Sequence, residues 1–228
     1  MIDMKNTLAI IMSLFFIATG FAQRKDFTKA EDIDQEAQKI LDKVSNKYEA
    51  YKSIEATFSL NIEIPEEPID TQTGKLKQEG DKYNVDLNFY SMICDGKNFW
   101  VHNKQNKEVQ LNDPPEEDEE EMMAPQDFYN FYKKGKYLFA LTNAIVENRV
   151  PLLQIEFKPL EDDSEYSKIR MTIEKKTSLV KRIKVFSKDG SRFTLEIQNF
   201  KANKKFTSAD FTFDKTKYPG VHVEDLRF

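Results

Sequence analysis

The spacing of apolar residues predicts one long helix near the start of the chain. Apolar side chains recur there every three or four positions, which is the pattern of one face of an amphipathic helix. Thr28 and Glu31 stand at the spacing of a capping box, in which two side chains bind backbone amides at a helix start. We therefore expect a helix from Thr28 to about Tyr51. Its apolar stripe consists of Ile33, Ala37, Ile40, Leu41, Val44, Tyr48 and Tyr51.

From Ser53 onward the period of the pattern changes to two, which is typical of half-buried strands. Pro65 and Pro68 end the first of these runs. A different pattern over 125–134 predicts a short helix, with Pro125 near its start and Gly135 as its stop. The expected strands cover residues 56–64, 74–77, 83–89, 91–94, 99–102, 109–111, 153–157, 169–173, 183–185, 193–197 and 211–213.

The segment "SMICDGKNFWVHN", residues 91–103, predicts a hairpin. Its central Asp95-Gly96 suits a tight turn, because such turns need positive φ. A two-residue turn would place Cys94 opposite Lys97, and a four-residue turn would place it opposite Phe99. The sequence leaves these two registers open.

In neither register does Cys94 reach His102, so a thiolate–imidazole pair within this hairpin is excluded. A pairing of Cys94 with His222 stays open, but a buried and unreactive thiol is the expected state. Both faces of the hairpin are apolar, so each needs a cover from a helix, a second layer or a ligand. One face carries Met92, Cys94, Phe99 and Val101, and the other carries Ile93, Trp100 and His102.

The order of elements predicts an α+β, mainly β fold. It consists of a helix, four or five strands, an acidic loop, a short helix and five or six further strands. Regular strands joined by turns indicate one large antiparallel sheet, which should curl into an incomplete β-barrel covered by the N-terminal helix and the short mid-chain helix. Two helices leave part of the concave face uncovered, so we expect an apolar cavity for an apolar guest.

The first residues of the chain have the features of a cleavable signal peptide. Leu8 to Ala18 form an apolar run too short to span a bilayer comfortably, and Gly20-Phe21-Ala22 is a small-x-small cleavage site. We therefore expect residues 1–22 to be removed and residues 23–228 to form a single domain in the periplasm. An uncleaved membrane anchor is the alternative.

Charge and cysteine content restrict the partners. The net charge is −5, and it stays −5 without residues 1–22, because that segment contains one acid, Asp3, and one base, Lys5. This mildly acidic balance argues against nucleic acid and against electrostatic docking on anionic lipid. The lone cysteine cannot form an internal disulfide.

No residue pattern in the chain indicates catalysis, a metal or a cofactor. The acidic run 113–121, "DPPEEDEEE", lacks the alternating ligands and the glycine of a calcium loop, and we expect it to be a solvated loop. His102 and His222 have no third ligand at the spacing of a zinc site. The chain has no G-x-S-x-G, no glycine-rich phosphate loop and no Ser/His/Asp signature. We therefore expect a protein that is not an enzyme.

An ordered series of segments resembles the periplasmic outer-membrane lipoprotein carrier family (LolA-like) over essentially all of residues 23–228. The most recognisable piece is the hairpin with Asp95, Gly96, Phe99 and Trp100. The series consists of "VSNKYEAYKSIEATFSL", "TGKLKQEGDKYNVDL", "ICDGKNFWVHNKQNKEVQL", "APQDFYNFYKKG", "YSKIRMTIEKKTSLVKRIKVFSKDG" and "FTFDKTKYPGVHVEDLRF".

The resemblance implies an incomplete β-barrel with a lid of helices that binds the acyl chains of lipoproteins. The implied partners are acylated lipoproteins, an inner-membrane ABC transporter that releases them and an outer-membrane acceptor, and we expect a monomer. Many members tether the lid with the arginine of an Arg-Pro pair. This chain has "QEGD" at 78–81 instead, with Lys77 and Lys82 as the nearest cations, so that latch cannot be carried over.

The helix at 28–51 and the segment 125–134 are the expected lid. Alternating residues of the strands and the aromatic residues of the short helix are the expected lining of the acyl-chain cavity. These candidates are Phe58, Leu60, Ile62, Val85, Leu87, Trp100, Phe128, Phe131, Phe157, Ile173, Ile183 and Val185.

Two other functions fit the same pattern. One is a periplasmic binding protein for another lipid, such as a fatty acid, a phospholipid or a glycolipid. The other is a regulator that senses lipoproteins or binds a partner protein. A bound free lipid would favour the first, and an additional domain would favour the second.

Overall fold

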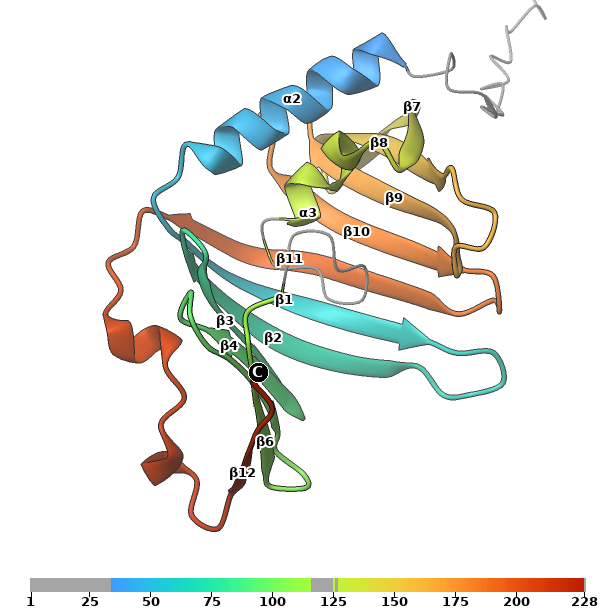
Figure 1. Cartoon of the computed structure of the whole chain (residues 1–228). Coiled ribbons are helices and arrows are strands. Elements are labelled where there is room, and N and C mark those ends of the chain that lie inside the picture. Colours follow the sequence, from blue (N-terminus) through green and yellow to red (C-terminus); the bar gives the residue numbers. More distant parts are fainter. Residues whose placement is uncertain (1–33, 116–124, 126, 228) are drawn as a thin grey trace, which may run out of the picture.

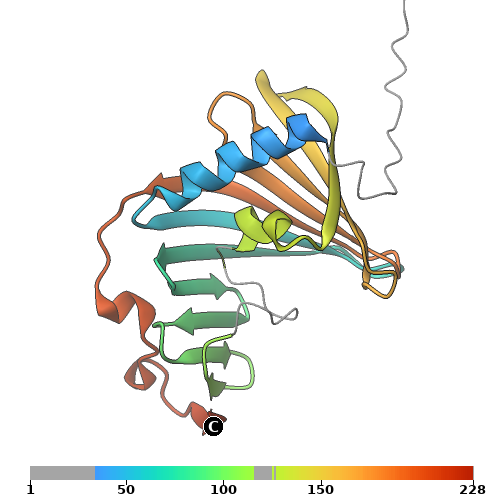
Figure 2. The same cartoon turned by 45° about the horizontal axis from the view of Figure 1, so that its top comes forward.

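The computed structural model describes residues 34–115, 125 and 127–227 (Figure 1). One sheet of twelve strands, in the order β12-β6-β5-β4-β3-β2-β1-β11-β10-β9-β8-β7, curls around two helical segments without closing (Figures 1 and 2). The predicted class, a mainly β protein with one curled sheet and two covering helices, is confirmed. Within the described part of the chain, no helix has the length and apolar character needed to cross a membrane.

The ends of the strands agree with the turn residues identified in the sequence. Pro65 and Pro68 follow directly on β1, as predicted. The bounds are β1 Ile54–Glu63, β2 Asp70–Glu79, β3 Lys82–Leu87, β4 Tyr90–Cys94, β5 Phe99–Asn103, β6 Glu108–Asn112, β7 Tyr137–Glu147, β8 Val150–Pro159, β9 Tyr166–Glu174, β10 Val180–Ser187, β11 Arg192–Ala202 and β12 His222–Asp225.

The long helix, α2, spans Gln35–Glu49. Asp34 caps it, because its side chain accepts hydrogen bonds from the amides of Glu36 and Ala37. Asp34 also binds the edge of β7: its amide donates to the Phe139 carbonyl at 3.2 Å. One residue therefore starts the helix and occupies part of an open sheet edge. The predicted capping box at Thr28 lies outside the described residues.

The short helix is present as α3, Asp127–Asn130, followed by the 3₁₀ turn η2, Phe131–Lys134. Gly135 ends it with a φ of 70°, a left-handed conformation that glycine adopts without strain. The prediction of a stop at this glycine is confirmed. In Figure 2, α3 lies beside α2 on the same side of the sheet.

Three predictions about strands were wrong. Strand β7 was missed, because its apolar residues do not alternate: Leu138, Phe139 and Ala140 are all buried. The expected strand at 211–213 is instead the end of the 3₁₀ turn η3, Ser208–Phe211, and extended chain. Six strands precede the acidic run, so the expected count of four or five was wrong, although each of the six alternating segments there forms a strand.

The sheet is also not wholly antiparallel. Strand β12 pairs parallel to β6, because residues 203–221 carry the chain along the outside of the sheet before it returns (Figure 1). This C-terminal segment contains the 3₁₀ turns η3 and η4, Lys215–Lys217. Its first residues are held at β1, where the Asn203 amide donates to the Ser53 carbonyl at 2.8 Å.

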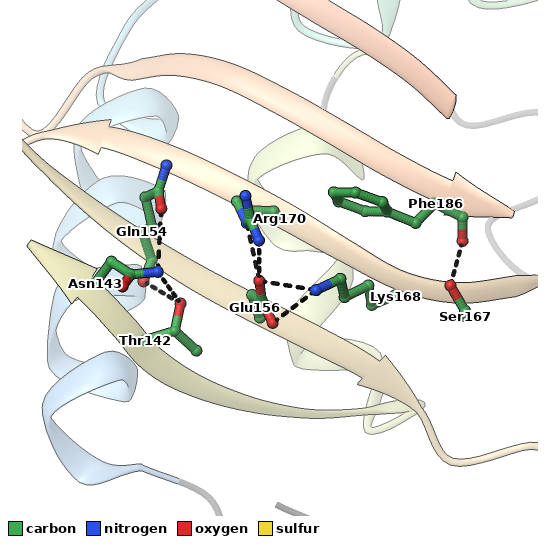
Figure 3. A network of polar contacts seen from close by, with 8 residues as sticks. All are labelled: Thr142, Asn143, Gln154, Glu156, Ser167, Lys168, Arg170 and Phe186. Atoms are coloured by element: carbon green, nitrogen blue, oxygen red, sulfur yellow. Dashed lines mark hydrogen bonds and ion pairs between the residues drawn. The ribbon is translucent and has the colours of Figure 1, made fainter. Parts of the chain in front are cut away.

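The two faces of the sheet differ in chemistry. The inner face, on which α2 and α3 lie, carries the main apolar core. The outer face of β7 to β10 carries cross-strand polar contacts (Figure 3). There Glu156 accepts hydrogen bonds from Lys168 at 3.1 Å and from Arg170 Nε at 2.9 Å. Burial raises the pKa of the Glu156 carboxyl, but these donors outweigh burial and the net pKa is lowered.

Candidate functional site

The strand pairing places nine of the predicted site residues, Phe58 among them, on one face of the sheet. Residues directly opposite each other in antiparallel strands share a face. Leu60 is opposite Leu195, which is opposite Ile183, which is in turn opposite Met171. By the same pairing this inner face carries Phe58, Leu60, Ile62, Val85, Leu87, Phe157, Ile173, Ile183 and Val185.

Some of these candidates are covered by the helices. Phe157 and Ile173 are 0% and 1% exposed, and they form one core with α2 and with Phe131 of η2. Phe128 of α3 is half-buried and packs against this core. These residues are ordinary core residues.

Other candidates on the inner face are half-buried. We call the following residues the open wall: Leu60 and Ile62 of β1, Val85 and Leu87 of β3, Val185 of β10, and Phe193, Leu195 and Ile197 of β11. The three β11 residues were not among the predicted site residues, although their alternation at 193–197 could have identified them.

Trp100 does not belong to this face. It alternates with Phe99 and Val101 along β5, so it points to the outer side of the sheet. There it packs with Ile93, Val109, Phe213 and Val221. The prediction that Trp100 lines the cavity is therefore corrected: the C-terminal segment covers it.

The hairpin of β4 and β5 has the four-residue turn, because Cys94 is opposite Phe99. Cys94 is buried with Tyr83 and Phe99 on the inner face. Burial raises the pKa of its thiol, which favours the unreactive form. The expected split of apolar residues between the two faces of this hairpin is confirmed. The C-terminal segment covers the outer face through Phe213 and Val221, whereas the residues of the inner-face cluster all come from β2 to β5 of the sheet itself.

Gly74 leaves space for the ring of Phe58, an inner-face residue of β1. A Cβ atom at this position would lie 2.2 Å from Cζ of Phe58, whose ring crosses β2 from the opposite position on β1. Any side chain at residue 74 would therefore displace Phe58.

Polar contacts fasten α3 and η2 to α2. Their partners on α2 stand at positions 42, 45 and 49, one stripe of the helix. The pairs are Ser45 Oγ with Asn130 Oδ1 at 2.6 Å, Tyr132 Oη with Asp42 Oδ1 at 2.9 Å, and Lys133 Nζ with Glu49 Oε1 at 2.8 Å. We call these three contacts the lid latch.

Helix α2 is itself fastened to the sheet. The amide of Val180 at the start of β10 donates to Tyr48 Oη at 3.1 Å, and Lys47 donates to the carbonyl of Thr177 at 2.5 Å. Burial raises the pKa of Tyr48 to about 12, so its hydroxyl stays protonated. Asp34 binds β7, so both ends of α2 are attached to the sheet. The polar contacts of the lid latch, in contrast, attach α3 and η2 to α2.

The sequence profile of one family, described as "Outer membrane lipoprotein carrier protein LolA", matches residues 49–214. This match covers well over half of the chain. The chain belongs to the LolA family. A search of curated protein sequences finds no match.

This LolA-family protein is similar to several solved structures. An uncharacterized conserved protein from Thermus thermophilus is 12% identical, with a TM-score of 0.55 over 84% of this chain and 99% of that chain. A putative outer membrane lipoprotein-sorting protein domain from Vibrio parahaemolyticus is 13% identical, with a TM-score of 0.43 over 76% and 94%. A LolA superfamily protein from Nitrosomonas europaea is 13% identical, with a TM-score of 0.41 over 78% and 97%. At 12% identity, the first of these supports the fold alone.

In the region where the resemblance implies a lid arginine, this LolA-family protein has Gln78 instead. Gln78 is buried there and lines a cavity of about 180 Å³ together with Tyr48 and Tyr129. Lys77 points to the outer face, where it pairs with Asp210 of η3 at 2.7 Å. Lys77 therefore holds the C-terminal segment, and the lid latch lies between the helices.

His102 is the buried titratable group beneath the C-terminal segment. Its ring is 2% exposed and meets the rings of Phe213 and Tyr218 edge-on, with centroids 5.3 Å and 4.5 Å away. Its Nδ1 has no hydrogen-bond partner. Burial lowers the pKa of His102, Lys104 lowers it further, and Asp86 opposes both.

We expect acid to destabilise the protein through His102. The unfolded chain binds the imidazole proton at about pH 6.5, while the folded chain binds it only at lower pH. Between these two pKa values the unfolded state holds more protons, so the free energy of unfolding decreases as the pH falls. Urea unfolding at about pH 7.5 and about pH 5.5 should show a smaller decrease for His102→Phe than for the wild type. A variant of the exposed His222 is the control, and equal decreases in all three proteins would contradict the assignment.

Proposed function

We propose that this LolA-family protein is a periplasmic carrier that binds the acyl chains of lipoproteins in the open wall. It would receive them from an inner-membrane ABC transporter and deliver them to an acceptor at the outer membrane. The observation that carries the proposal is the open wall itself. It is a contiguous set of half-buried apolar side chains on the inner face, beside helices that polar contacts hold in place.

The physics of a carrier fits this arrangement. Each buried methylene contributes about 0.8 kcal/mol, so complete burial of several acyl chains would make release very slow. The closed state offsets part of that gain. Phe131 is 3% exposed and packs against Phe157 at 4.6 Å between centroids, and these contacts must be given up before the chains can reach the covered core. Transfer to a better acceptor then needs no catalytic residue.

A charge in the open wall should abolish this function. We expect Leu60→Glu to weaken binding of a triacylated lipopeptide about tenfold or more, because a carboxylate would face the apolar chains. Asn61→Glu is the matched control, since residue 61 is on the same strand and faces the outer side. Titration with a fluorescent lipopeptide would measure both. Equal affinities of the two variants would remove the open wall from the binding site.

The identity of the guest is tested by capture from the native host. Tagged protein recovered gently from the periplasm should carry acylated lipoproteins in near one-to-one amounts, and the Leu60→Glu variant should not. Free phospholipid or fatty acid without lipoprotein would keep the fold and the open wall but change the function to general lipid binding. A tightly bound protein without lipid would indicate the regulatory function.

A further inference from the structure

A second apolar hollow lies at the β7 edge of the sheet, away from the open wall. It has a volume of about 400 Å³ and opens between α2, η2 and the edge strand β7. Its lining includes Tyr132, Tyr137, Phe139 and Leu160. Small-molecule sites commonly have volumes of roughly 300–1,000 Å³ and an apolar lining with few polar groups. We call this hollow the edge pocket.

The edge pocket is separate from the open wall. Strands β8 and β9 lie between β7 and β10, the nearest strand of the open wall. On the inner face of these two strands, Phe157, Ile155 and Met171 are fully buried in the core beneath the helices. Phe131 lies between the edge pocket and this core. Its ring centroid is 5.3 Å from that of Tyr137, which lines the pocket, and 4.6 Å from that of Phe157, which belongs to the core. A molecule in the edge pocket therefore does not need the lid to open.

The charged groups at the pocket are cationic. Lys133 lines the pocket, and Lys134 and Lys136 stand on either side of the lining residue Gly135. Lys133 is 44% exposed, and its ammonium group is 2.8 Å from Glu49 Oε1. None of the described residues that line the pocket is acidic. An apolar hollow with an ammonium group beside it is complementary to an acyl chain with an anionic head.

We propose that the edge pocket binds a single-chain anionic amphiphile, of the class of a fatty acid, with its head group at Lys133. The volume suits one chain, whereas a triacylated lipid anchor needs the open wall. This second site goes beyond the proposed carrier function and does not depend on it. It gives the protein a ligand that occupies the closed state.

The first experiment measures the head-group preference with cis-parinaric acid, a fluorescent fatty acid, and its methyl ester. We expect Lys133→Gln to weaken binding of the acid about two- to fivefold, the range for a partly exposed ion pair, and to leave the ester unchanged. Glu49→Gln is the matched control, because it breaks the same ion pair of the lid latch but keeps the ammonium group. It should not weaken binding of the acid. Equal weakening by both variants, or equal effects on acid and ester, would overturn the head-group assignment.

The second experiment locates the chain. A palmitic acid analogue with a diazirine near its methyl end is bound to the wild-type protein, activated by light and mapped by mass spectrometry. We expect labels on residues 132–139 and on Leu160. Labels confined to β1 and β11 would overturn the proposal, because the fatty acid would then occupy the open wall. The lipopeptide titration with Leu60→Glu does not involve the edge pocket, so the two proposals can fail independently.

Discussion

Phe157→Ala lowers the free energy of unfolding by about 3–5 kcal/mol, the range for removing a fully buried phenylalanine. The ring is 0% exposed, and it contacts Phe131 of the lid and Phe139 of the edge strand, with centroids 4.6 Å and 5.8 Å away. Its removal leaves a cavity where the lid, the helix and the sheet meet. Because the total stability of a domain is about 5–15 kcal/mol, this loss is a large fraction of it.

Urea unfolding followed by circular dichroism measures the effect. Val146→Ala is the control, because Val146 is an apolar residue of the same sheet but 68% exposed, and its loss should be within about 0.5 kcal/mol. A loss below about 1 kcal/mol for Phe157→Ala would mean that the helices and the sheet do not share one core.

We expect the double variant Asn130→Ala with Tyr132→Phe to increase the population of the open lid without unfolding the protein. It removes two hydrogen bonds of the lid latch, each worth about 1–1.5 kcal/mol. Their partners on α2 keep other contacts. Ser45 Oγ lies 3.0 Å from Glu49 Oε1 and can donate its single hydrogen there once Asn130 is replaced, and Asp42 still accepts from Gln38 at 2.8 Å. The closed state should therefore lose about 2–3 kcal/mol, which corresponds to a roughly 30- to 150-fold larger open population.

Hydrogen exchange of the amides in residues 127–134 measures this population. We expect faster exchange there, unchanged exchange in β9 and β10, and faster uptake of a fluorescent lipopeptide. Tyr166→Phe is the matched control, since Tyr166 is an exposed tyrosine of β9 far from the latch in sequence. Unchanged exchange in the double variant would show that apolar packing alone keeps the lid closed.

The lid latch gives this chain an attachment for the lid that does not use the arginine that the resemblance implies. That arginine would tie the lid to the sheet, whereas Asp42, Ser45 and Glu49 tie α3 and η2 to α2. The hydrogen bond from Lys133 is the largest cause that lowers the pKa of Glu49. Helix α2 then transmits the attachment to the sheet through Tyr48 and Asp34. We therefore expect the short segment from residue 127 to Gly135 to be the part that moves.

The alternation of apolar residues could predict most of the sheet and most of the inner face. Leu60, Ile62, Val85 and Leu87 alternate with polar residues, and a strand has only two faces, so each run assigns its own residues. What a run cannot assign is which of its faces is the inner one. Trp100 shows this limit: its strand is apolar on both sides, and only the C-terminal segment decides which side is covered by protein.

Strand β7 shows a second limit. Leu138 and Ala140 are buried on one side of the strand and Phe139 on the other, so no period of two is visible. The lid latch and the edge pocket show a third limit. Asp42 and Tyr132 are 90 residues apart in the chain, and the pairing of polar side chains at that separation leaves no local pattern.

The sequence by itself determined most of the strands, their turns, the helix stop at Gly135 and the apolar character of the inner face, because these depend on near neighbours in the chain. The tertiary structure alone decided the curl of the sheet, the parallel addition of β12, the division of apolar residues between covered core and open wall, and the latch between α2 and η2. These features depend on contacts between segments distant in sequence, and such contacts arise only when the whole sheet has formed.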